Sequence, residues 1–504
     1  MTSGKIQENL SGRQCSRVHK WLTAATVLVG LVSSWAPGAA AQDRSGYAVH
    51  FRPVDHAVGD VHPFFFDGVC YLFYLRPGGF HSALVTSHDL LQWESAKLTV
   101  DVAHPANSKV PYFVLGVIRD AQAPGNRFRS YYGHKNAMYS SESEDLLHWR
   151  ASDDSFRVPE GEELFRRRRD PFVFWNEDEQ KFWCVMTTQL HDRPQDRAGA
   201  ISYATSSNLQ DWTNEGLLLD TGSMGEPECP QMFKIGEYWY LLFSEYHQAV
   251  GGPTYLRSRQ SRGPWELADA DVLDGKDLCA AQVAHDGNSW VLMGWIPDTP
   301  ARPGNQAWGG HLALPREIFS RDHGRLGSRI HSSIREKIRG SRLKVTRSTP
   351  EMVDQASHGI VLPQLAVDIE IVWKPNENQK NWRGRFFQTA KPTGAVHTVD
   401  VVIEGDRMRI LDNQGTVWGE LPTDLLGTVA QEASVATRIL IDRDILEVHV
   451  SNTYSLVARV PIDLEGAVFS SLTMETEDVG RHAVSEVAVF QLLNSASIPH
   501  DAAK

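Results

Sequence analysis

Three acidic residues stand at or near the starts of apolar, strand-like runs. Asp60 precedes one run, Asp170 lies in Arg169-Asp170-Pro171, and Glu228 lies between two prolines. Proline fixes φ and lacks an N–H donor, so it suits the first residues of a strand. Glycoside hydrolysis uses two carboxylates across a glycosidic bond, one at the anomeric carbon and one to protonate the leaving oxygen. A third acid can hold sugar hydroxyls and raise the pKa of its neighbour by like-charge repulsion.

One short segment recurs along the chain and predicts how these acids are brought together. It begins with Ser, continues through polar residues and a Leu, and ends with Trp. Its copies are Ser87 to Trp93, Ser143 to Trp149, Ser206 to Trp212 and, in divergent form, Ser258 to Trp265. Similar units of short strands and turns are typical of a β-propeller. We expect five blades with the Trp side chains packed between them. The fifth blade is predicted over 278–319, with 291–296 as its inner strand.

The predicted fold is all-β, a five-bladed β-propeller over 46–338 followed by a β-sandwich over 345–495. A charged segment at 334–347 reads as a linker with a short helix. Beyond it, apolar and polar residues alternate, as expected of strands with one buried face. In a propeller, inner strands begin around one axial mouth. Asp60, Asp170 and Glu228 are therefore expected to share a pocket in blades one, three and four.

The charge balance of the chain and the pattern of its first 41 residues indicate which partners and which cellular location to expect. The 504-residue chain has 50 basic and 62 acidic residues, which argues against nucleic-acid or anionic-membrane partners. Positive residues, the apolar run 22–32 and three alanines at 39–41 predict a cleaved signal peptide over 1–41. We expect a secreted or periplasmic protein, free of the membrane after cleavage. The oligomeric state is open.

No metal or other cofactor is expected. The 20 histidines are dispersed, and four cysteines beyond residue 41 lack the paired spacing of a zinc or redox motif. Cys70 and Cys184 lie in strand-like runs and are predicted to be buried thiols. An exported protein could form a disulfide among Cys70, Cys184, Cys229 and Cys279, and the sequence leaves the pairing open.

Several of these segments together resemble glycoside hydrolase family 32, the β-fructosidases (invertases, inulinases, levanases and fructosyltransferases). Glu228-Cys229-Pro230 is similar to its acid/base motif, Arg169-Asp170-Pro171 to its stabiliser motif, and Gly59-Asp60 to its nucleophile strand. The resemblance implies that Asp60 is the nucleophile of a retaining double displacement. It implies that Glu228 is the acid and then the base, and that Asp170 stabilises the transition state. Arg169 would pair with a carboxylate or bind sugar.

The resemblance also implies further contacts with a small carbohydrate or a polysaccharide. Phe80 and Ser82 resemble an element beside the sugar pocket, and Trp308 and His62 are additional candidates. Arg166, Arg167 and Arg168 are expected on a solvated loop, and the alternative is a basic rim that recruits an anionic substrate.

Two departures concern the choice of sugar. The family typically has Asn where Gly59 stands, and often Gln where Leu75 stands. Both side chains would normally touch the fructosyl unit, and loss of such hydrogen bonds redirects or relaxes specificity.

The leading hypothesis is an exported hydrolase of terminal β-fructofuranosides such as sucrose or fructans. One alternative is an enzyme of the same fold that uses another furanoside, such as an arabinofuranoside, or transfers the sugar to an acceptor. The other is a carbohydrate-binding propeller without catalysis.

Overall fold

The computed structural model describes most of the chain after residue 45. The described residues are 46–77, 81–101, 114–134, 137–152, 165–245, 252–266, 271–298, 308–344, 346–347, 360–363, 366–373, 381–389, 396–425, 434–464, 467–473 and 484–495. All of them belong to one unit, Ala40–Lys504. The predicted signal peptide and Phe80 lie outside the described residues.

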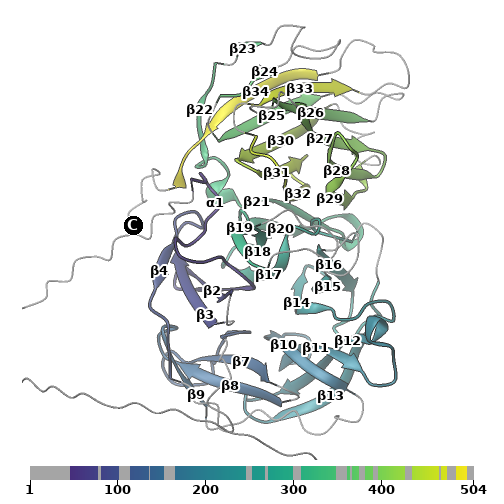
Figure 1. Cartoon of the computed structure of the whole chain (residues 1–504). Helices are drawn as coiled ribbons and strands as arrows, with labels where there is room; N and C mark the ends of the chain where they lie inside the picture. The colour runs from purple at the N-terminus through teal and green to yellow at the C-terminus, as the bar shows by residue number, and fades with distance from the viewer. Residues whose placement is uncertain are drawn as a thin grey trace, which may run out of the picture. The chain divides into compact units, whose positions relative to one another are not determined.

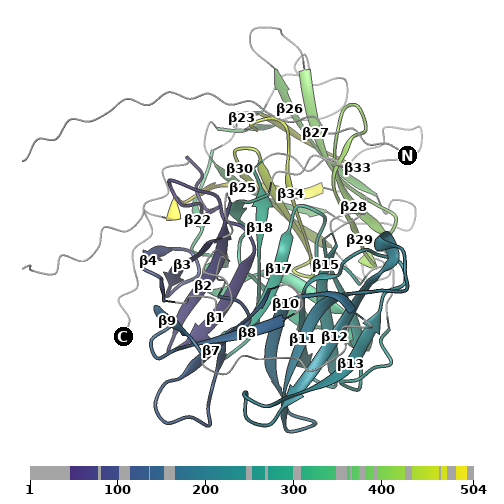
Figure 2. The same cartoon turned by 60° about the horizontal axis from the view of Figure 1, so that its bottom comes forward.

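Five antiparallel sheets follow one another along the chain and form the predicted blades (Figures 1 and 2). The first sheet contains β1 (Val61–Phe66), β2 (Val69–Arg76), β3 (His81–Ser87) and β4 (Glu94–Ala96). The second contains β6 (Ile118–Arg119), β7 (Phe128–His134), β8 (Ala137–Ser143) and β9 (His148–Ala151), with β5 (Thr99–Asp101) added in parallel. The third contains β10 (Phe165–Asn176), β11 (Lys181–Leu190), β12 (Gly199–Ser206) and β13 (Trp212–Asp220). The 3-10 turn η1 (Gln195–Arg197) precedes β12.

The last two blades complete the propeller. The fourth contains β14 (Glu228–Ile235), β15 (Tyr238–Glu245) and β16 (Gly252–Ser258). The fifth contains β17 (Cys279–His285), β18 (Trp290–Pro297), β19 (Gly310–Leu312), β20 (Arg316–Ser320) and β21 (Leu326–Ile330), with η2 (Asp322–Gly324) between the last two. Strand β1 contacts β17, β17 contacts β14, and β14 contacts β10, which places these strands around the axis. A bridge between Val58 and Gly310 also joins the first blade to the fifth.

The fifth blade corrects one prediction. Residues 291–296 lie in β18, the second strand, while β17 lies at the inner edge of the sheet. β17 is less apolar, but its small buried residues Ala280 and Ala281 allow neighbouring inner strands to approach closely. The sheet also continues beyond the predicted end at 319, through β21.

The recurring Ser-to-Trp segment forms the same turn in three blades. Ser87 Oγ accepts a 2.8 Å hydrogen bond from the Leu90 N–H, and Asp89 accepts one of 2.8 Å from the Gln92 N–H. Leu90 has a φ of 67°, which these side-chain bonds help to hold. The second copy repeats both bonds at Ser143 and Asp145. In the third copy, Ser206 Oγ accepts a hydrogen bond from the Asn208 N–H, and the Asn208 side chain accepts one from the Asp211 N–H. The Trp side chains of all three copies are buried, which confirms that they pack within the propeller.

Two further sheets form the C-terminal sandwich. One has the order β22 (Arg339–Arg342), β34 (Val484–Leu492), β25 (Val367–Trp373), β30 (Val435–Asp442), β31 (Ile445–Val450) and β32 (Tyr454–Arg459). The other has the order β23 (Thr346–Arg347), β24 (Ile360–Val361), β33 (Val468–Thr473), β26 (Trp382–Thr389), β27 (Val396–Glu404), β28 (Arg407–Asp412) and β29 (Val417–Pro422). One apolar cluster fills the space between them. The five sheets and this sandwich confirm the predicted fold class. The short helix α1 (Ser332–Arg335) and β22 occupy the segment predicted as a linker.

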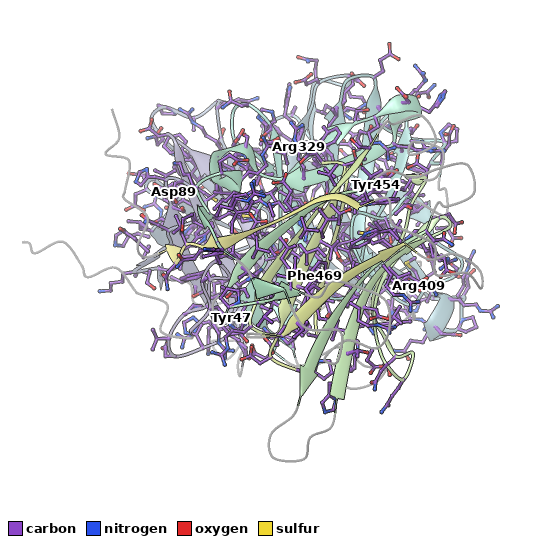
Figure 3. The ribbon with its side chains drawn as sticks, turned by 90° about the horizontal axis from the view of Figure 1, so that it is seen from above. Tyr47, Asp89, Arg329, Arg409, Tyr454 and Phe469 are labelled. Atoms are coloured by element: carbon purple, nitrogen blue, oxygen red, sulfur yellow. The ribbon has the colours of Figure 1, made fainter. Side chains whose placement is uncertain are left out.

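Buried charges join the propeller to the sandwich. His50 lies between Asp442, at 2.8 Å, and Glu447, at 3.1 Å. Glu447 also accepts a 3.1 Å hydrogen bond from Arg316 of the fifth blade. Tyr47, labelled in Figure 3, donates a 2.6 Å hydrogen bond to a carboxylate in the β30–β31 turn. His50 and Arg316 therefore have carboxylate partners across the junction, which offsets their loss of hydration.

Candidate active site

The guanidinium of Arg169 contacts three carboxylates where the inner strands of the third and fourth blades meet. Arg169 Nη1 donates to Asp170, while Nη2 donates to Glu226 and, at 2.6 Å, to Glu228. All four side chains are only partly exposed. Burial alone would lower the pKa of Arg169, but the surrounding carboxylates raise it above its ordinary value. Arg169 is therefore a permanent cation in a cluster with excess negative charge.

β-Bulges set the direction of the side chains in this cluster. Glu228 is the first residue of β14, as predicted, and a register shift follows it. Asp170 was predicted to open its strand but lies inside β10, because that strand already begins at Phe165. A bulge at Asp170, with φ of 51°, interrupts the pairing there. Cys229 has the same φ, and its N–H donates a 3.3 Å hydrogen bond to Asp170. Such bulges re-aim side chains next to active sites.

Asp60 approaches the cluster from the first blade. Its backbone is fixed by hydrogen bonds with Leu75 of β2, one from the Gly59 N–H at 2.9 Å and one to the Asp60 carbonyl at 3.1 Å. The indole N–H of Trp295, on β18, donates a 3.1 Å hydrogen bond to the Asp60 carboxylate. Burial, then the charges of Asp170 and Glu228, raise the pKa of Asp60 to about 7, and the Trp295 bond opposes this shift.

Glu228 shares this environment. Burial raises its pKa, Arg169 lowers it, and the charges of Asp170 and Glu226 raise it again. Asp60 and Glu228 therefore form an interacting pair that loses its protons in coupled steps. Two interacting carboxyl groups, one protonated and one ionised, are the groups that proton transfer to a leaving oxygen requires.

Trp308 lies directly over Gly59, the residue before Asp60. A Cβ added at Gly59 would lie 2.2 Å from the nearest indole carbon of Trp308, so only glycine fits under the ring. Trp308 also packs edge-on against Trp295, with ring centroids 5.8 Å apart. The space that a side chain at position 59 would enter is thus filled by an aromatic ring. The glycine at position 59 is therefore explained by the Trp308 ring that covers it.

His62 lies close to Asp170 but faces polar residues of the inner strands. Burial lowers the pKa of His62 to about 4, while Asp170 and a hydrogen bond with Gln282 oppose this shift. His62 is therefore neutral near pH 7. Gln282, on β17, accepts a 3.3 Å hydrogen bond from Gln231 of β14. These side chains connect the inner strands of blades one, four and five.

The remaining predicted residues are placed differently. Ser82 lies opposite Leu75 in the first blade, and its Oγ accepts a 2.8 Å hydrogen bond from the Val114 N–H. It therefore links two blades beside the Asp60 loop. The expectation of a solvated loop at Arg166 to Arg168 was wrong, because these residues belong to β10. Arg168 is buried, with its guanidinium 4.6 Å from the Phe165 ring centre.

Two residues of the site were not predicted, Glu226 and Trp295. Glu226 had no independent signal, since an acid in a Pro-rich loop is usually a solvated residue. Trp295 lies in the segment 291–296, which was predicted as an apolar strand of the fifth blade without any role for its side chain in the site. Their contacts with Arg169 and Asp60 connect residues that are distant in the sequence.

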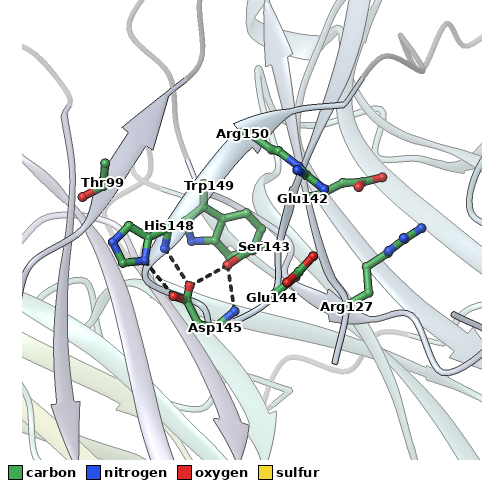
Figure 4. Close-up of a pocket in the computed structure, with 9 residues that line it drawn as sticks. All are labelled: Thr99, Arg127, Glu142, Ser143, Glu144, Asp145, His148, Trp149 and Arg150. Carbon is green, nitrogen blue, oxygen red and sulfur yellow. Dashed lines mark hydrogen bonds and ion pairs between the residues drawn. The ribbon is translucent and has the colours of Figure 1, made fainter. Parts of the chain in front are cut away.

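A pocket of about 480 Å³ in the second blade is separate from this cluster (Figure 4). Its lining contains none of the predicted site residues, and Ser143, Asp145 and His148 are engaged in the blade's turn. Among the described residues, no group of His, Cys, Asp or Glu could hold a metal ion. Cys70, Cys184, Cys229 and Cys279 are buried free thiols, which confirms the prediction for the first two.

Comparison with known proteins identifies the family. The family description "Glycosyl hydrolases family 32 N-terminal domain" matches residues 50–329. The chain belongs to glycosyl hydrolases family 32. The matched region contains all five blades and every residue of the carboxylate cluster.

Individual family 32 relatives cover different parts of the chain. Raffinose invertase of Escherichia coli is 33% identical over 189 residues, which are 34% of this chain and 37% of that enzyme. Sucrose-6-phosphate hydrolase of Escherichia coli is 25% identical over 413 residues, covering 74% of this chain and 79% of that enzyme. Fructan 1-exohydrolase IIa of Cichorium intybus has a similar structure, with a TM-score of 0.67 and 15% identity. That match covers 90% of this chain and 98% of the other, and it shows a shared fold.

Proposed function

We propose that this family 32 protein is an exported retaining glycoside hydrolase that removes terminal β-fructofuranosyl units. The observation that carries the proposal is the convergence of Asp60 and Glu228 beside the Arg169–Asp170 pair. The names of its relatives, an invertase and a sucrose-6-phosphate hydrolase, support a sucrose-like substrate. Export rests on the signal-like character of residues 1–41. Among the described residues, no helix has the length and apolar character to cross a membrane.

The proposed reaction has two displacements at the anomeric carbon. Asp60 attacks this carbon as Glu228 protonates the leaving oxygen, which forms a glycosyl–enzyme ester. Glu228 then takes a proton from water, and the water oxygen displaces Asp60 with a second inversion, so the configuration is retained. In this reaction Asp170 binds sugar hydroxyls and stabilises positive charge on the ring, a role supported by its contacts with Arg169 and the Cys229 N–H.

A product assay tests this proposal. Protein beginning at Gln42 is incubated with sucrose, kestose, inulin and levan, and the anomer released first is identified by NMR. We expect β-fructose from wild type and losses of several orders of magnitude in Asp60→Asn and Glu228→Gln. Glu179→Gln, which alters an ion pair with Arg262 outside the cluster, is the control for folding and charge. Inverted product, or unchanged activity in either variant, would contradict the mechanism.

A second candidate is hydrolysis of another furanoside, and the Gly59–Trp308 contact favours it. The ring fills space that an amide side chain would otherwise use, which removes a hydrogen-bond partner for a sugar hydroxyl. Arabinofuranosides are therefore included in the assay. Cleavage of these compounds with all fructosides left intact would favour this candidate. Sugar binding without cleavage of any compound would favour a non-catalytic role.

A further inference from the structure

Glu226 is a carboxylate for which the proposed reaction has no chemical step. It nevertheless contacts the same guanidinium nitrogen as Glu228, because Arg169 Nη2 donates to both. Its side chain is 15% exposed, so this contact is not a solvated surface pair. A surface ion pair contributes little, whereas charges in a partly dry pocket act strongly on one another.

The backbone around Glu226 is fixed by the third blade. The Gly225 carbonyl accepts a 3.1 Å hydrogen bond from Gln189, and the Pro227 carbonyl accepts one of 2.6 Å from Thr187. The Gly199 N–H bonds the Met224 carbonyl at 2.8 Å. A Cβ at Gly199 would approach that carbonyl oxygen to 2.7 Å, so the loop packs closely on β12. Glu226 is thus presented to Arg169 by a constrained loop.

We propose that Glu226 is a positioning residue that shares Arg169 with Glu228 and prevents this cation from holding the acid permanently as a carboxylate. The inference rests on the proposed function, since it concerns the acid of that reaction. Arg169 paired with Glu228 alone would favour its ionised form, which cannot protonate a leaving oxygen. A second carboxylate on the same nitrogen weakens that preference through competition and like-charge repulsion.

Other charged and titratable groups around Glu228 also influence its protonation. Arg169 and Asp170 face it from β10, and Asp60 faces it from the first blade. The Cys229 thiol follows it in the chain, with a pKa raised by burial, and His62 is neutral beside Asp170. Asp60 and Asp170 have roles in the reaction and cannot be altered without affecting it. The charge of Glu226, in contrast, can be removed without altering a residue that takes part in the proposed reaction.

The direct test is an infrared titration of wild type and Glu226→Gln. The band of the protonated Glu228 carboxyl is identified by its loss in Glu228→Gln. We expect the midpoint of this band to fall by about one pH unit in Glu226→Gln. Glu226→Asp, which keeps the charge, should retain most of the wild-type midpoint, and Glu179→Gln should not change it. Thermal unfolding of each variant checks that the fold is preserved.

The alkaline limb of kcat/KM provides a second measurement. At pH values above this limb, Glu226→Gln should be about tenfold less active than wild type, with full recovery toward lower pH. An unchanged infrared midpoint in a folded Glu226→Gln would overturn the inference, as would an equal loss of activity at every pH. Inactivity of wild type on all furanosides would refute the proposed function instead, while the infrared result would still decide the role of Glu226.

Discussion

Replacing Trp295 with phenylalanine should raise the pKa of Asp60 and move the acid limb of activity to higher pH. Trp295 donates the one hydrogen bond to the Asp60 side chain that is found among the described residues, at 3.1 Å. The bond stabilises the carboxylate, which is the form that the proposed attack on the anomeric carbon requires. Phenylalanine keeps an aromatic ring beside Trp308 but has no N–H to donate.

The size of the effect follows from the bond that is lost. A hydrogen bond to a charged group contributes about 1.5–3 kcal/mol, which corresponds to about one to two pKa units. Asp60 begins with a pKa of about 7 and is therefore close to half ionised at pH 7. A rise of about one unit would leave about a tenth of it ionised. Activity at pH 7 should then fall about fivefold, and more for a larger shift.

The assay is kcat/KM across pH for wild type, Trp295→Phe and Trp290→Phe. Trp290 lies on the same strand but packs against Phe233 and His285, away from the carboxylates. Its replacement should leave the acid limb unchanged. An unmoved acid limb in a folded Trp295→Phe would refute the role assigned to this hydrogen bond. A uniform loss at all pH values would indicate that Trp295 acts through packing alone.

Two further predictions concern packing and buried charge. Gly59→Ala should reduce activity at least about tenfold, because its Cβ would collide with Trp308, and the added change Trp308→Leu should restore part of the loss in a double-mutant cycle. Full activity of Gly59→Ala alone would contradict this. His50 is the second case: burial opposes its protonation, but Asp442 and Glu447 raise its pKa to about 9. Since its unfolded pKa is near 6.5, this contribution of up to about 3 kcal/mol is complete below pH 6.5 and lost as pH rises through 9. Chemical unfolding from pH 6 to 10 should show the free energy of unfolding of wild type falling as pH rises, and a smaller fall in His50→Gln. An equal fall in both proteins would exclude His50 as its source.

The blades were predictable because their signals are local. The segment from Ser87 to Trp93 contains the whole set of turn hydrogen bonds, and its copies repeat the same side chains. The acids Asp60 and Glu228 were also recognisable from their places at the starts of strands. Residues that act within a few positions of one another leave a pattern in the sequence.

The missed features depend on contacts between blades. Four consecutive arginines resemble a solvated run, yet burial depends on the neighbouring sheets, and Arg168 is covered while Arg169 enters the carboxylate cluster. Glu226 looks like any loop acid until Arg169 is placed beside it. The inner strand of the fifth blade was misjudged because β18 is the more apolar strand, whereas position at the axis is decided by packing between sheets.

The sandwich packs against the strand that holds Asp60, although it contributes none of the carboxylates of the candidate site. Asp60 is held by Trp295, which is carried by β18, and the carbonyl of Pro297 at the end of that strand accepts a 2.5 Å hydrogen bond from Arg459. The apolar core of the fifth blade also includes Ile445 and Val457 of the sandwich. Since buried side chains on both sides share one core, movement of β18 would disrupt contacts in both parts. Packing of the sandwich against the fifth blade therefore fixes the strand whose Trp295 side chain bonds the carboxylate that is proposed to attack the sugar.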